Sequence, residues 1–164
     1  MNSAAHDPIA ATKYSRADCE IGVVHLGFGA FHRAHQAVYL DDYMEKTNDL
    51  RWGIAAVNLR GSEAAHFQTA HQDVERHDGY FLKAFSADGK ISLRRVRSHI
   101  HFADWSIDRS ETEALLSKPS VHLVTITVTE SGYYTDPNGD LNLADPTIKA
   151  EKSGGTAHSV YGYL

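Results

Sequence analysis

The stretch Val23–Tyr39, VVHLGFGAFHRAHQAVY, decides the fold of this chain. A short apolar run leads into Gly27-Phe28-Gly29, and the residues that follow are helical in character, with no polar loop in between. Doubly wound α/β domains hold the pyrophosphate of a dinucleotide at such a strand-to-helix turn. Gly27 suits the tight turn, and Gly29 lets the backbone approach the phosphate oxygens because it has no Cβ. The start of the helix adds unpaired N–H groups and the positive end of its dipole.

The glycines alone form an incomplete dinucleotide fingerprint, because His32 stands where a third small residue is usual. A glycine-rich turn between an ordinary strand and helix is therefore the alternative. The flanking residues favour the dinucleotide interpretation, since Phe31, Ala34 and Val38 repeat at spacings of three and four and give the helix an apolar face.

A second apolar run, WGIAAV over residues 52–57, ends at Asn58-Leu59-Arg60. In a βαβ unit the end of this strand lies near the adenosine ribose, where an acidic residue would bond the hydroxyls and repel a 2′-phosphate. Asn58 and Arg60 stand there instead. Arg60 suits contact with a 2′-phosphate, stacking on adenine, or simple exposure to solvent, so the sequence leaves NADP open beside NAD.

Periodicity and turn signals predict the remaining elements. Ser86-Ala87-Asp88-Gly89 predicts a hairpin turn between two β-rich runs. A near-continuous apolar run over 121–129 is typical of the buried centre of a parallel sheet. The expected order is strand 22–26, helix 31–46, strand 52–57, helix 62–73, strands 80–85 and 90–97, helix 109–117 and strand 121–129. This order predicts a Rossmann-like, doubly wound α/β fold whose mostly parallel sheet carries an inserted β-hairpin.

Thr129 and Glu130 follow the last strand directly. Ligands of open α/β sheets bind at the carboxyl ends of the strands, so both residues are candidates for the cofactor site. A polar strand end with its hydrogen bonds satisfied is the alternative.

Composition limits the class of protein. A length of 164 residues, of which 42% are hydrophobic, fits one globular domain, and the net charge of −5 argues against nucleic-acid binding. A single cysteine allows neither an internal disulfide nor a cysteine metal site, and it fits the cytoplasm. We expect no membrane span and no signal peptide. Residues 1–19 are expected to form a flexible extension, and residues 20–164 the dinucleotide-binding domain.

Eleven histidines raise the question of a metal site. His32 and His35 are three apart on a helix, and His99 and His101 are two apart on a probable strand, where they would share a face. No HExxH or CxxC pattern accompanies them, so we expect no metal.

The last residues predict a helix capped by Thr156, with Ala157, Val160, Tyr161 and Leu164 on its apolar face. That face is unfinished at Leu164. We therefore expect the chain to be the front part of a longer protein.

HLGFGAFHRAHQAVYLDDY, WGIAAVNLR, TVTESGYY and the final YGYL occur in this order over residues 21–164, and each resembles a segment of the mannitol dehydrogenase family. This family contains long-chain polyol dehydrogenases and sugar-acid reductases. WGIAAVNLR looks most like D-arabinitol dehydrogenases, with mannitol dehydrogenases and fructuronate or mannonate oxidoreductases as close competitors.

The resemblance implies an NAD-dependent, zinc-independent oxidoreductase that acts on a CH–OH group of a polyol or sugar acid. It assigns Gly27, Phe28, Gly29, Phe31 and His32 to the pyrophosphate loop, with His32 as a donor to a phosphate oxygen. It places Asn58 and Arg60 at the adenosine end, and Thr129 and Glu130 near the nicotinamide. The catalytic lysine of the family belongs to a helical C-terminal domain that has no counterpart here, so we expect no catalytic residue in this chain. That absent domain would pack on this one, and a non-catalytic nucleotide-binding module is the alternative function.

Overall fold

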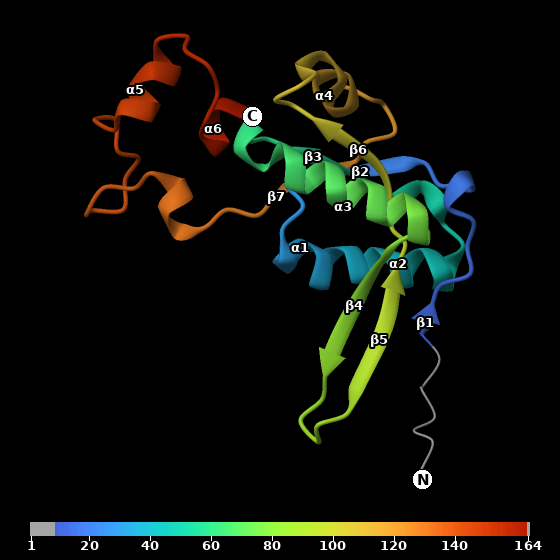
Figure 1. Cartoon of the computed structure of the whole chain (residues 1–164). Helices are drawn as coiled ribbons and strands as arrows, with labels where there is room; N and C mark the ends of the chain where they lie inside the picture. Colours follow the sequence, from blue (N-terminus) through green and yellow to red (C-terminus); the bar gives the residue numbers. More distant parts are fainter. Residues whose placement is uncertain (1–8, 164) are drawn as a thin grey trace. The chain divides into compact units, whose positions relative to one another are not determined.

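The computed structural model describes residues 9–163 and divides the chain into two compact units, Met1–Ile126 and Thr127–Leu164. The first unit holds a four-stranded parallel sheet, with its elements labelled in Figure 1. Its strands in spatial order are β6 (His99–Asp104), β3 (Gly53–Asn58), β2 (Ile21–Leu26) and β7 (Leu123–Ile126). The chain runs outward from β2 through β3 to β6, and then returns to the other side of β2. This reversal beside β2 is the switch point of a doubly wound α/β sheet, so the expected fold class is confirmed.

Helices connect the parallel strands. They are α1 (Ala30–Ala34) and α2 (Gln36–Thr47) after β2, α3 (Ala64–His77) after β3, and α4 (Arg109–Leu116) after β6. Short 3-10 helices are η1 (Arg16–Asp18), η2 (Leu50–Trp52) and η3 (Gly61–Glu63). The single helix expected over 31–46 is divided at His35, whose φ of −124° and ψ of −83° leave the helical region.

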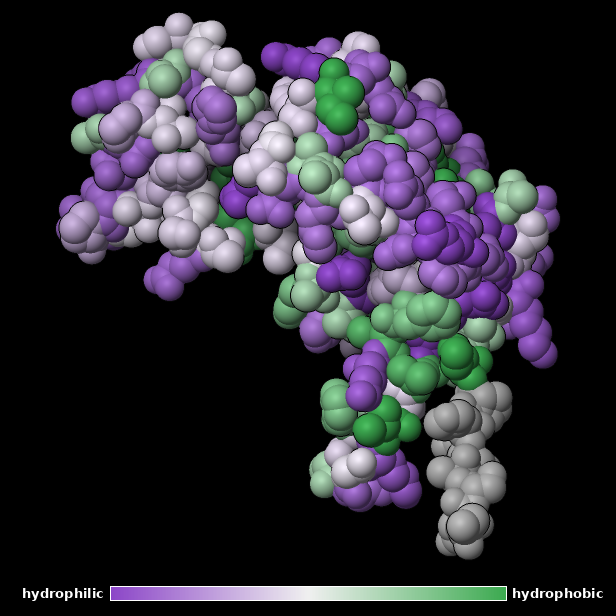
Figure 2. All heavy atoms as spheres, viewed as in Figure 1, coloured by the Kyte–Doolittle hydropathy of each residue, from purple (hydrophilic) through white to green (hydrophobic). Residues whose placement is uncertain are grey.

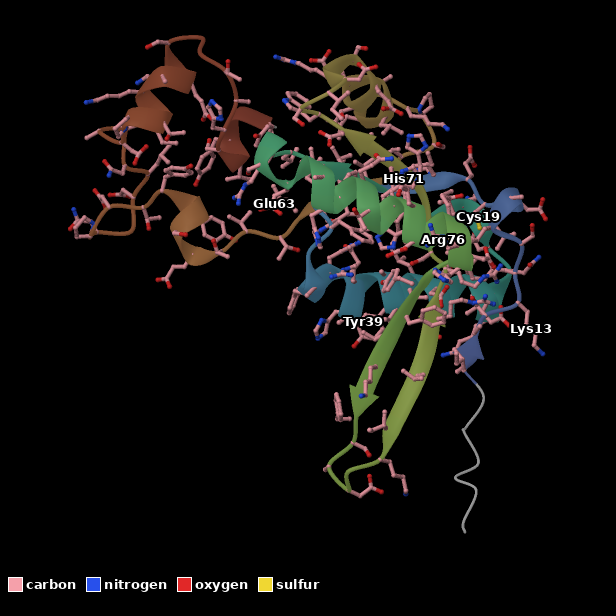
Figure 3. The ribbon with its side chains drawn as sticks, viewed as in Figure 1. Lys13, Cys19, Tyr39, Glu63, His71 and Arg76 are labelled. Atoms are coloured by element: carbon pink, nitrogen blue, oxygen red, sulfur yellow. The ribbon has the colours of Figure 1, made fainter. Side chains whose placement is uncertain are left out.

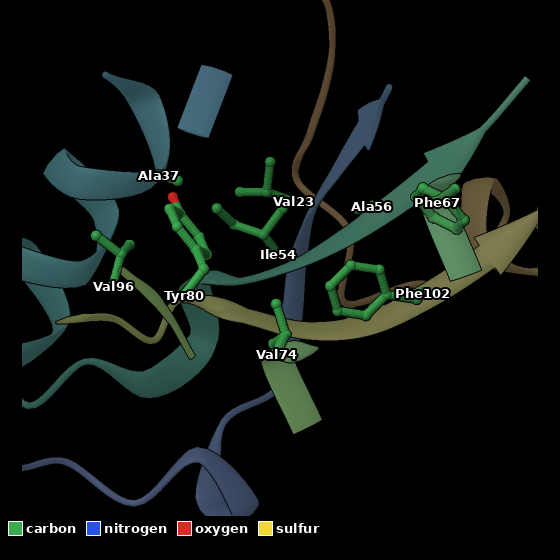
Figure 4. Close-up of a cluster of buried hydrophobic side chains, with 9 residues drawn as sticks. All are labelled: Val23, Ala37, Ile54, Ala56, Phe67, Val74, Tyr80, Val96 and Phe102. Carbon is green, nitrogen blue, oxygen red and sulfur yellow. The ribbon is translucent and has the colours of Figure 1, made fainter. Parts of the chain in front are cut away.

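The core lies between this sheet and the helices α2 and α3. Ala37 of α2 and Val74 of α3 join strand residues in one buried cluster, so both helices pack on the same face of the sheet. Figure 3 marks the N-cap of α3 by Glu63 and its last turn by Arg76. The cluster, drawn in Figure 4, consists of Val23, Ala37, Ile54, Ala56, Phe67, Val74, Tyr80, Val96 and Phe102.

A β-hairpin is inserted between α3 and β6, as the turn signal predicts. Its strands β4 (Tyr80–Phe85) and β5 (Ile91–Val96) pair antiparallel, and the short β1 (Ala10–Ala11) pairs parallel with β5. Strand pairing places four large apolar side chains on one face of the hairpin, and Figure 2 shows hydrophobic residues gathered there. These residues are Phe81, Phe85, Ile91 and Leu93, which are between 42% and 70% exposed.

The strand expected at the buried centre of the sheet lies at its edge. β7 spans Leu123–Ile126, whereas the apolar run covers 121–129, and Leu123 and Val124 are each 40% exposed. Within the described residues β7 pairs only with β2, so one of its edges has no neighbouring strand. The expected central position is therefore wrong, because apolar periodicity reports a strand that suits burial and not which neighbours cover it.

β6 follows the hairpin, and the predicted order of elements omits it, passing from strand 90–97 directly to helix 109–117. The register of β6 against β3 shifts between the pairs Ile54–His99 and Ala55–His101, which marks a bulge. His99 bonds His32 of α1, while His101 bonds Glu111 of α4. The two histidines do not converge, so the expectation that they share a face is wrong, and the bulge is the reason.

The described part of the expected extension, residues 9–19, is anchored rather than loose. Residues 1–8 of the expected flexible extension lie outside the described residues. The remainder of 1–19 is held by Tyr14, which is 7% exposed and donates its hydroxyl to Asp41 over 2.6 Å. Arg97 donates to the carbonyl oxygen of Tyr14 over 2.8 Å. These buried bonds explain why a polar segment without apolar periodicity is ordered here.

The second unit contains η4 (Glu130–Tyr133), α5 (Pro146–Lys152) and α6 (Val160–Tyr163). The sequence prediction missed α5, although Asp145 caps it by accepting the N–H of Thr147 over 2.8 Å. α6 begins at Val160, so Thr156 is not its cap, and Leu164 lies outside the described residues. None of the helices described in either unit has the length and hydropathy required to cross a bilayer.

Candidate cofactor site

The glycine turn, defined as Gly27-Phe28-Gly29, joins β2 to α1 at the switch point of the sheet. Gly27 has a φ of +123°, a conformation that side chains rarely permit, and its N–H donates to the carbonyl oxygen of Val57 over 2.7 Å. Gly29 is the N-cap of α1 with an ordinary φ of −70°. A Cβ built on Gly29 would have no heavy atom within 4 Å. The backbone conformation therefore requires glycine at position 27. At position 29 the conformation is ordinary, and the absence of a side chain instead leaves open space for a ligand.

The start of α1 presents unpaired backbone donors to this open space. The first N–H bonded within the helix is that of Arg33, which donates to the carbonyl oxygen of Gly29 over 3.1 Å. The N–H groups of residues 30–32 therefore have no acceptor in the helix, as at any helix start. Phosphate oxygens are suitable acceptors for such a row of donors. The turn has both the space and the donors that a pyrophosphate requires.

Side chains of the turn divide between core and surface. Phe28 points inward and meets Phe102 edge-on, with ring centroids 5.3 Å apart, so only its backbone faces the open side. Phe31 is 65% exposed and stacks on His35, with centroids 4.4 Å apart. The guanidinium of Arg33 lies 5.0 Å from the centroid of the Phe28 ring. Of these side chains, that of Phe31 is accessible to a bound molecule.

His32 does not face the open side of the turn. It is 1% exposed, and its Nδ1 lies 2.9 Å from Gln36 Oε1 while its Nε2 lies 2.9 Å from His99 Nε2. Both ring nitrogens are occupied inside the protein. The expectation that the His32 side chain donates to a phosphate oxygen is therefore wrong, because this side chain is part of the core. Only the backbone N–H of His32 remains available to a ligand.

The end of β3 carries the two residues expected at adenosine. Asn58 is 6% exposed, and its amide donates to the carbonyl oxygen of Arg60 over 3.0 Å and to Asp104 Oδ2 over 2.9 Å. The Arg60 N–H donates back to Asn58 Oδ1 over 3.3 Å, so Asn58 fixes the loop and keeps one free acceptor lone pair. Arg60 itself is exposed. Asp104, which the sequence analysis missed, adds an acidic group beside this strand end.

Thr129 and Glu130 lie in the second unit, whereas the glycine turn lies in the first. Thr129 is the N-cap residue of η4, and its hydroxyl lies 3.2 Å from that of Ser131. Glu130 is exposed and lines an open pocket of about 480 Å³. The other residues that line it are Ser131, Tyr134, Thr135, Asn142 and Asp145. All are polar, which suits a hydroxylated molecule.

Titratable groups in the part of the chain that the structure describes do not form a metal centre. No three His, Cys, Asp or Glu side chains among residues 9–163 converge as ligands would. Burial raises the pKa of the Cys19 thiol to about 11, so the single cysteine stays protonated at neutral pH.

The sequence analysis also missed the partners of His32. His25 of β2 is 2% exposed and stacks on the His32 ring, with centroids 3.5 Å apart, and His99 is fully buried. Burial lowers the pKa of His25 to about 3 and that of His32 to about 4, so both rings are neutral in the folded protein. His25 stands within an apolar run of its strand, and this local pattern gave no sign that three histidines meet.

A parallel α/β sheet with a glycine turn and free helix donors at its switch point defines a dinucleotide-binding domain. Residues 21–157 match the family described as the mannitol dehydrogenase Rossmann domain. This chain belongs to the mannitol dehydrogenase family, as the sequence motifs indicate.

Curated relatives agree with this assignment. A mannitol 2-dehydrogenase from Pyrenophora tritici-repentis is 35% identical over 95% of this chain, which spans 27% of that protein. A D-mannonate oxidoreductase from Escherichia coli is 32% identical over 96% of this chain, which spans 32% of that protein. The chain thus covers about a third or less of these relatives.

A solved structure of similar fold is the Pseudomonas fluorescens mannitol 2-dehydrogenase in a ternary complex with NAD and D-mannitol. It has a TM-score of 0.81 and 28% identity, and the match covers 94% of this chain and 31% of that one. A D-sorbitol dehydrogenase in substrate-free form gives a TM-score of 0.80 at 28% identity, over 94% of this chain and 32% of the other.

Proposed function

We propose that this chain is the NAD-binding part of an oxidoreductase that interconverts a sugar alcohol, of the arabinitol or mannitol type, and a ketose. The observation that carries the proposal is the open space at Gly29 beside three unpaired N–H groups, at the switch point of a mannitol dehydrogenase family domain. When bound, the nicotinamide of NAD would supply the hydride acceptor for a CH–OH group.

Each part of the chain has a separate role in this proposal. The backbone from Gly29 to His32 binds the pyrophosphate, and Gly27 holds the turn in shape. Asn58 and Arg60 face the adenosine end, where the buried amide of Asn58 orients the loop that carries Arg60. Thr129 and Glu130 stand near the nicotinamide, as the family motif TVTE suggests. Support for NAD over NADP comes from the relative solved with NAD.

The base that accepts the hydroxyl proton comes from a further domain in this proposal. This chain spans only 27% and 32% of the two curated relatives, and they are named a dehydrogenase and an oxidoreductase. The exposed apolar side chains of β7 support packing of such a domain on this one. By itself, the chain binds NAD without turnover.

A sugar acid is the second candidate substrate. The 32% identity with a D-mannonate oxidoreductase is close to the 35% identity with a mannitol 2-dehydrogenase, so the domain itself favours neither substrate class strongly. Substrate choice belongs to residues outside the cofactor domain in this account.

A fluorescence titration with NADH and NADPH tests the proposal. Wild-type chain is expected to bind NADH saturably, with NADPH weaker, and Gly29→Val is expected to abolish binding because the side chain fills the phosphate space. Loss of a favourable N-cap residue lowers the folding stability of this variant by only about 1 kcal/mol. Ala84→Val, on the exposed hairpin, is the matched control and should bind as wild type does. Unchanged NADH affinity in folded Gly29→Val would show that the turn is not the cofactor site.

A further inference from the structure

Three buried histidines lie behind the glycine turn and form what we call the histidine cluster: His25 of β2, His32 of α1 and His99 of β6. None of them is more than 2% exposed. The rings of His25 and His32 stack with planes 6° apart, and His32 Nε2 lies 2.9 Å from His99 Nε2. The proposed binding of NAD does not use any of these side chains.

A chain of hydrogen bonds fixes one proton on each ring. Gln36 Oε1 can only accept, so it accepts both the Thr125 hydroxyl, over 3.0 Å, and the Nδ1–H of His32, over 2.9 Å. Thr125 then accepts the Nδ1–H of His25 over 2.8 Å. His32 Nε2 is left as an acceptor, so His99 Nε2–H donates to it. This assignment makes all three rings neutral.

Three ring nitrogens carry no proton in this assignment, and two of these three have no hydrogen-bond partner among the described residues. His25 Nε2 and His99 Nδ1 are buried without a hydrogen bond among the described residues. A proton added to either would be a buried charge with no acceptor. The pKa of His99 is lowered by burial and by its neighbours, as are those of the other two rings.

Charged groups around the cluster oppose a further positive charge. Arg33 of α1 acts on His32 and His99, and Arg16 of η1 acts on His99, to whose carbonyl oxygen it donates over 2.7 Å. Tyr80 of β4 also faces the cluster, with its ring centroid 5.6 Å from that of His99. Burial raises the pKa of Tyr80, so it stays uncharged. Among the described residues, the largest electrostatic contributions to the pKa values of these rings come from histidine and arginine side chains and none from a carboxylate.

The glycine turn rests directly on the cluster. A Cβ on Gly27 would lie 3.7 Å from His25 Nε2, and the Phe28 ring meets the His99 ring edge-on with centroids 4.9 Å apart. His32 is itself part of the helix that follows the turn. The rings of His25 and His99 therefore lie directly against the turn, and His32 lies in the first turn of the helix that follows it.

We propose that the histidine cluster positions the glycine turn, holding it in its NAD-binding shape while uncharged and releasing it when a proton enters. This inference rests on the proposed function, since NAD is the ligand of the turn. Acid weakens NAD binding through the protein interior, without any titration of the cofactor contacts themselves.

Isothermal titration calorimetry with NAD at pH 7.5 and pH 4.0 tests this coupling. Because the pKa of His32 is about 4 and that of His25 is about 3, wild-type affinity is expected to fall about twofold at pH 4.0. Each NAD bound at pH 4.0 is expected to release about half a proton, counted in buffers of different ionisation enthalpy. His25→Phe keeps a ring against His32 but removes the bare nitrogen, so the slope of log Kd against pH should be smaller by up to one. His66→Gln, at an exposed site on α3, is the matched control and should follow wild type.

Equal affinity of wild type at both pH values, or zero proton release at pH 4.0, would overturn the inference without needing any variant. Urea unfolding at the same two pH values, without NAD, separates it from the proposed function. If folded wild type binds no NAD at pH 7.5, the proposed function fails. A weaker pH dependence of stability in His25→Phe would then still support the cluster as a pH-dependent support of the turn, and equal dependence would refute it.

Discussion

Asp41 and Asp42 of α2 provide a matched test of how burial sets the strength of an ion pair. Each carboxylate lies 2.7 Å from the same guanidinium nitrogen of Arg94, but the Asp41 side chain is fully buried and that of Asp42 is 40% exposed. Asp41 Oδ1 also accepts from Tyr14, over 2.6 Å, and from the backbone N–H of Arg97, over 3.0 Å. Asp41 therefore joins the N-terminal segment, α2 and β5.

Asp41→Asn keeps the acceptor oxygen but turns an N–H donor toward Arg94. Loss of the charge-assisted hydrogen bond to Arg94 costs about 1.5–3 kcal/mol of stability. The new amide N–H then faces the Arg94 N–H without an acceptor, which costs about 1–3 kcal/mol more. We expect a loss of about 3–5 kcal/mol in the free energy of unfolding, or about 6–20 °C in Tm for a chain of this size. Asp42→Asn should lose no more than about 1 kcal/mol, because water screens an exposed pair.

Urea unfolding followed by tryptophan fluorescence measures both variants. Limited proteolysis should in addition cut Asp41→Asn, but not Asp42→Asn, within residues 9–19. Equal losses of stability in the two variants, or a loss below about 1 kcal/mol for Asp41→Asn, would refute the argument that burial decides the strength of this network.

Three further predictions concern the site. Gly27→Ala forces a side chain into a φ of +123°, so this variant should lose about 1–3 kcal/mol in the free energy of unfolding, whereas Gly29→Ala should lose less than about 1 kcal/mol. Thermal unfolding compares the two variants, and equal losses would contradict the claim that the backbone conformation requires glycine at position 27. The histidine cluster has lowered pKa values, about 3 and 4 for two of its rings against an ordinary 6.5, so the unfolded chain binds more protons as the pH falls from 6.5 toward 4. The free energy of unfolding should therefore fall by about 1.4 kcal/mol per histidine between pH 7.5 and pH 5.5, and urea midpoints that show no loss would disprove the neutral cluster. Arg60→Ala should weaken NADPH binding more than NADH binding in parallel titrations, and an equal change for both would exclude contact with a 2′-phosphate.

The sequence predicts the parts of this fold that local patterns encode. Two strand–helix units, the glycine turn and the inserted hairpin follow from apolar periodicity and from turn residues. The break at His35 and the position of β7 do not follow, because they depend on contacts with elements far away in the chain. Leu123 shows the limit most clearly, since an apolar run predicts burial but its neighbours decide it.

The candidate site shows the same division. The backbone roles of Gly27 and Gly29 are encoded locally and could be predicted. The inward orientation of His32 could not, because its partner His99 lies 67 residues away along the chain. Likewise, Asp104 reaches Asn58 only because β6 pairs with β3.

A crystal structure of the chain with NADH tests the central claim most directly. We expect the pyrophosphate oxygens within hydrogen-bond distance of the N–H groups of residues 30–32, above the open face of Gly29. The adenosine should lie toward Asn58 and Arg60. A pyrophosphate bound elsewhere, with the glycine turn left free, would contradict the account.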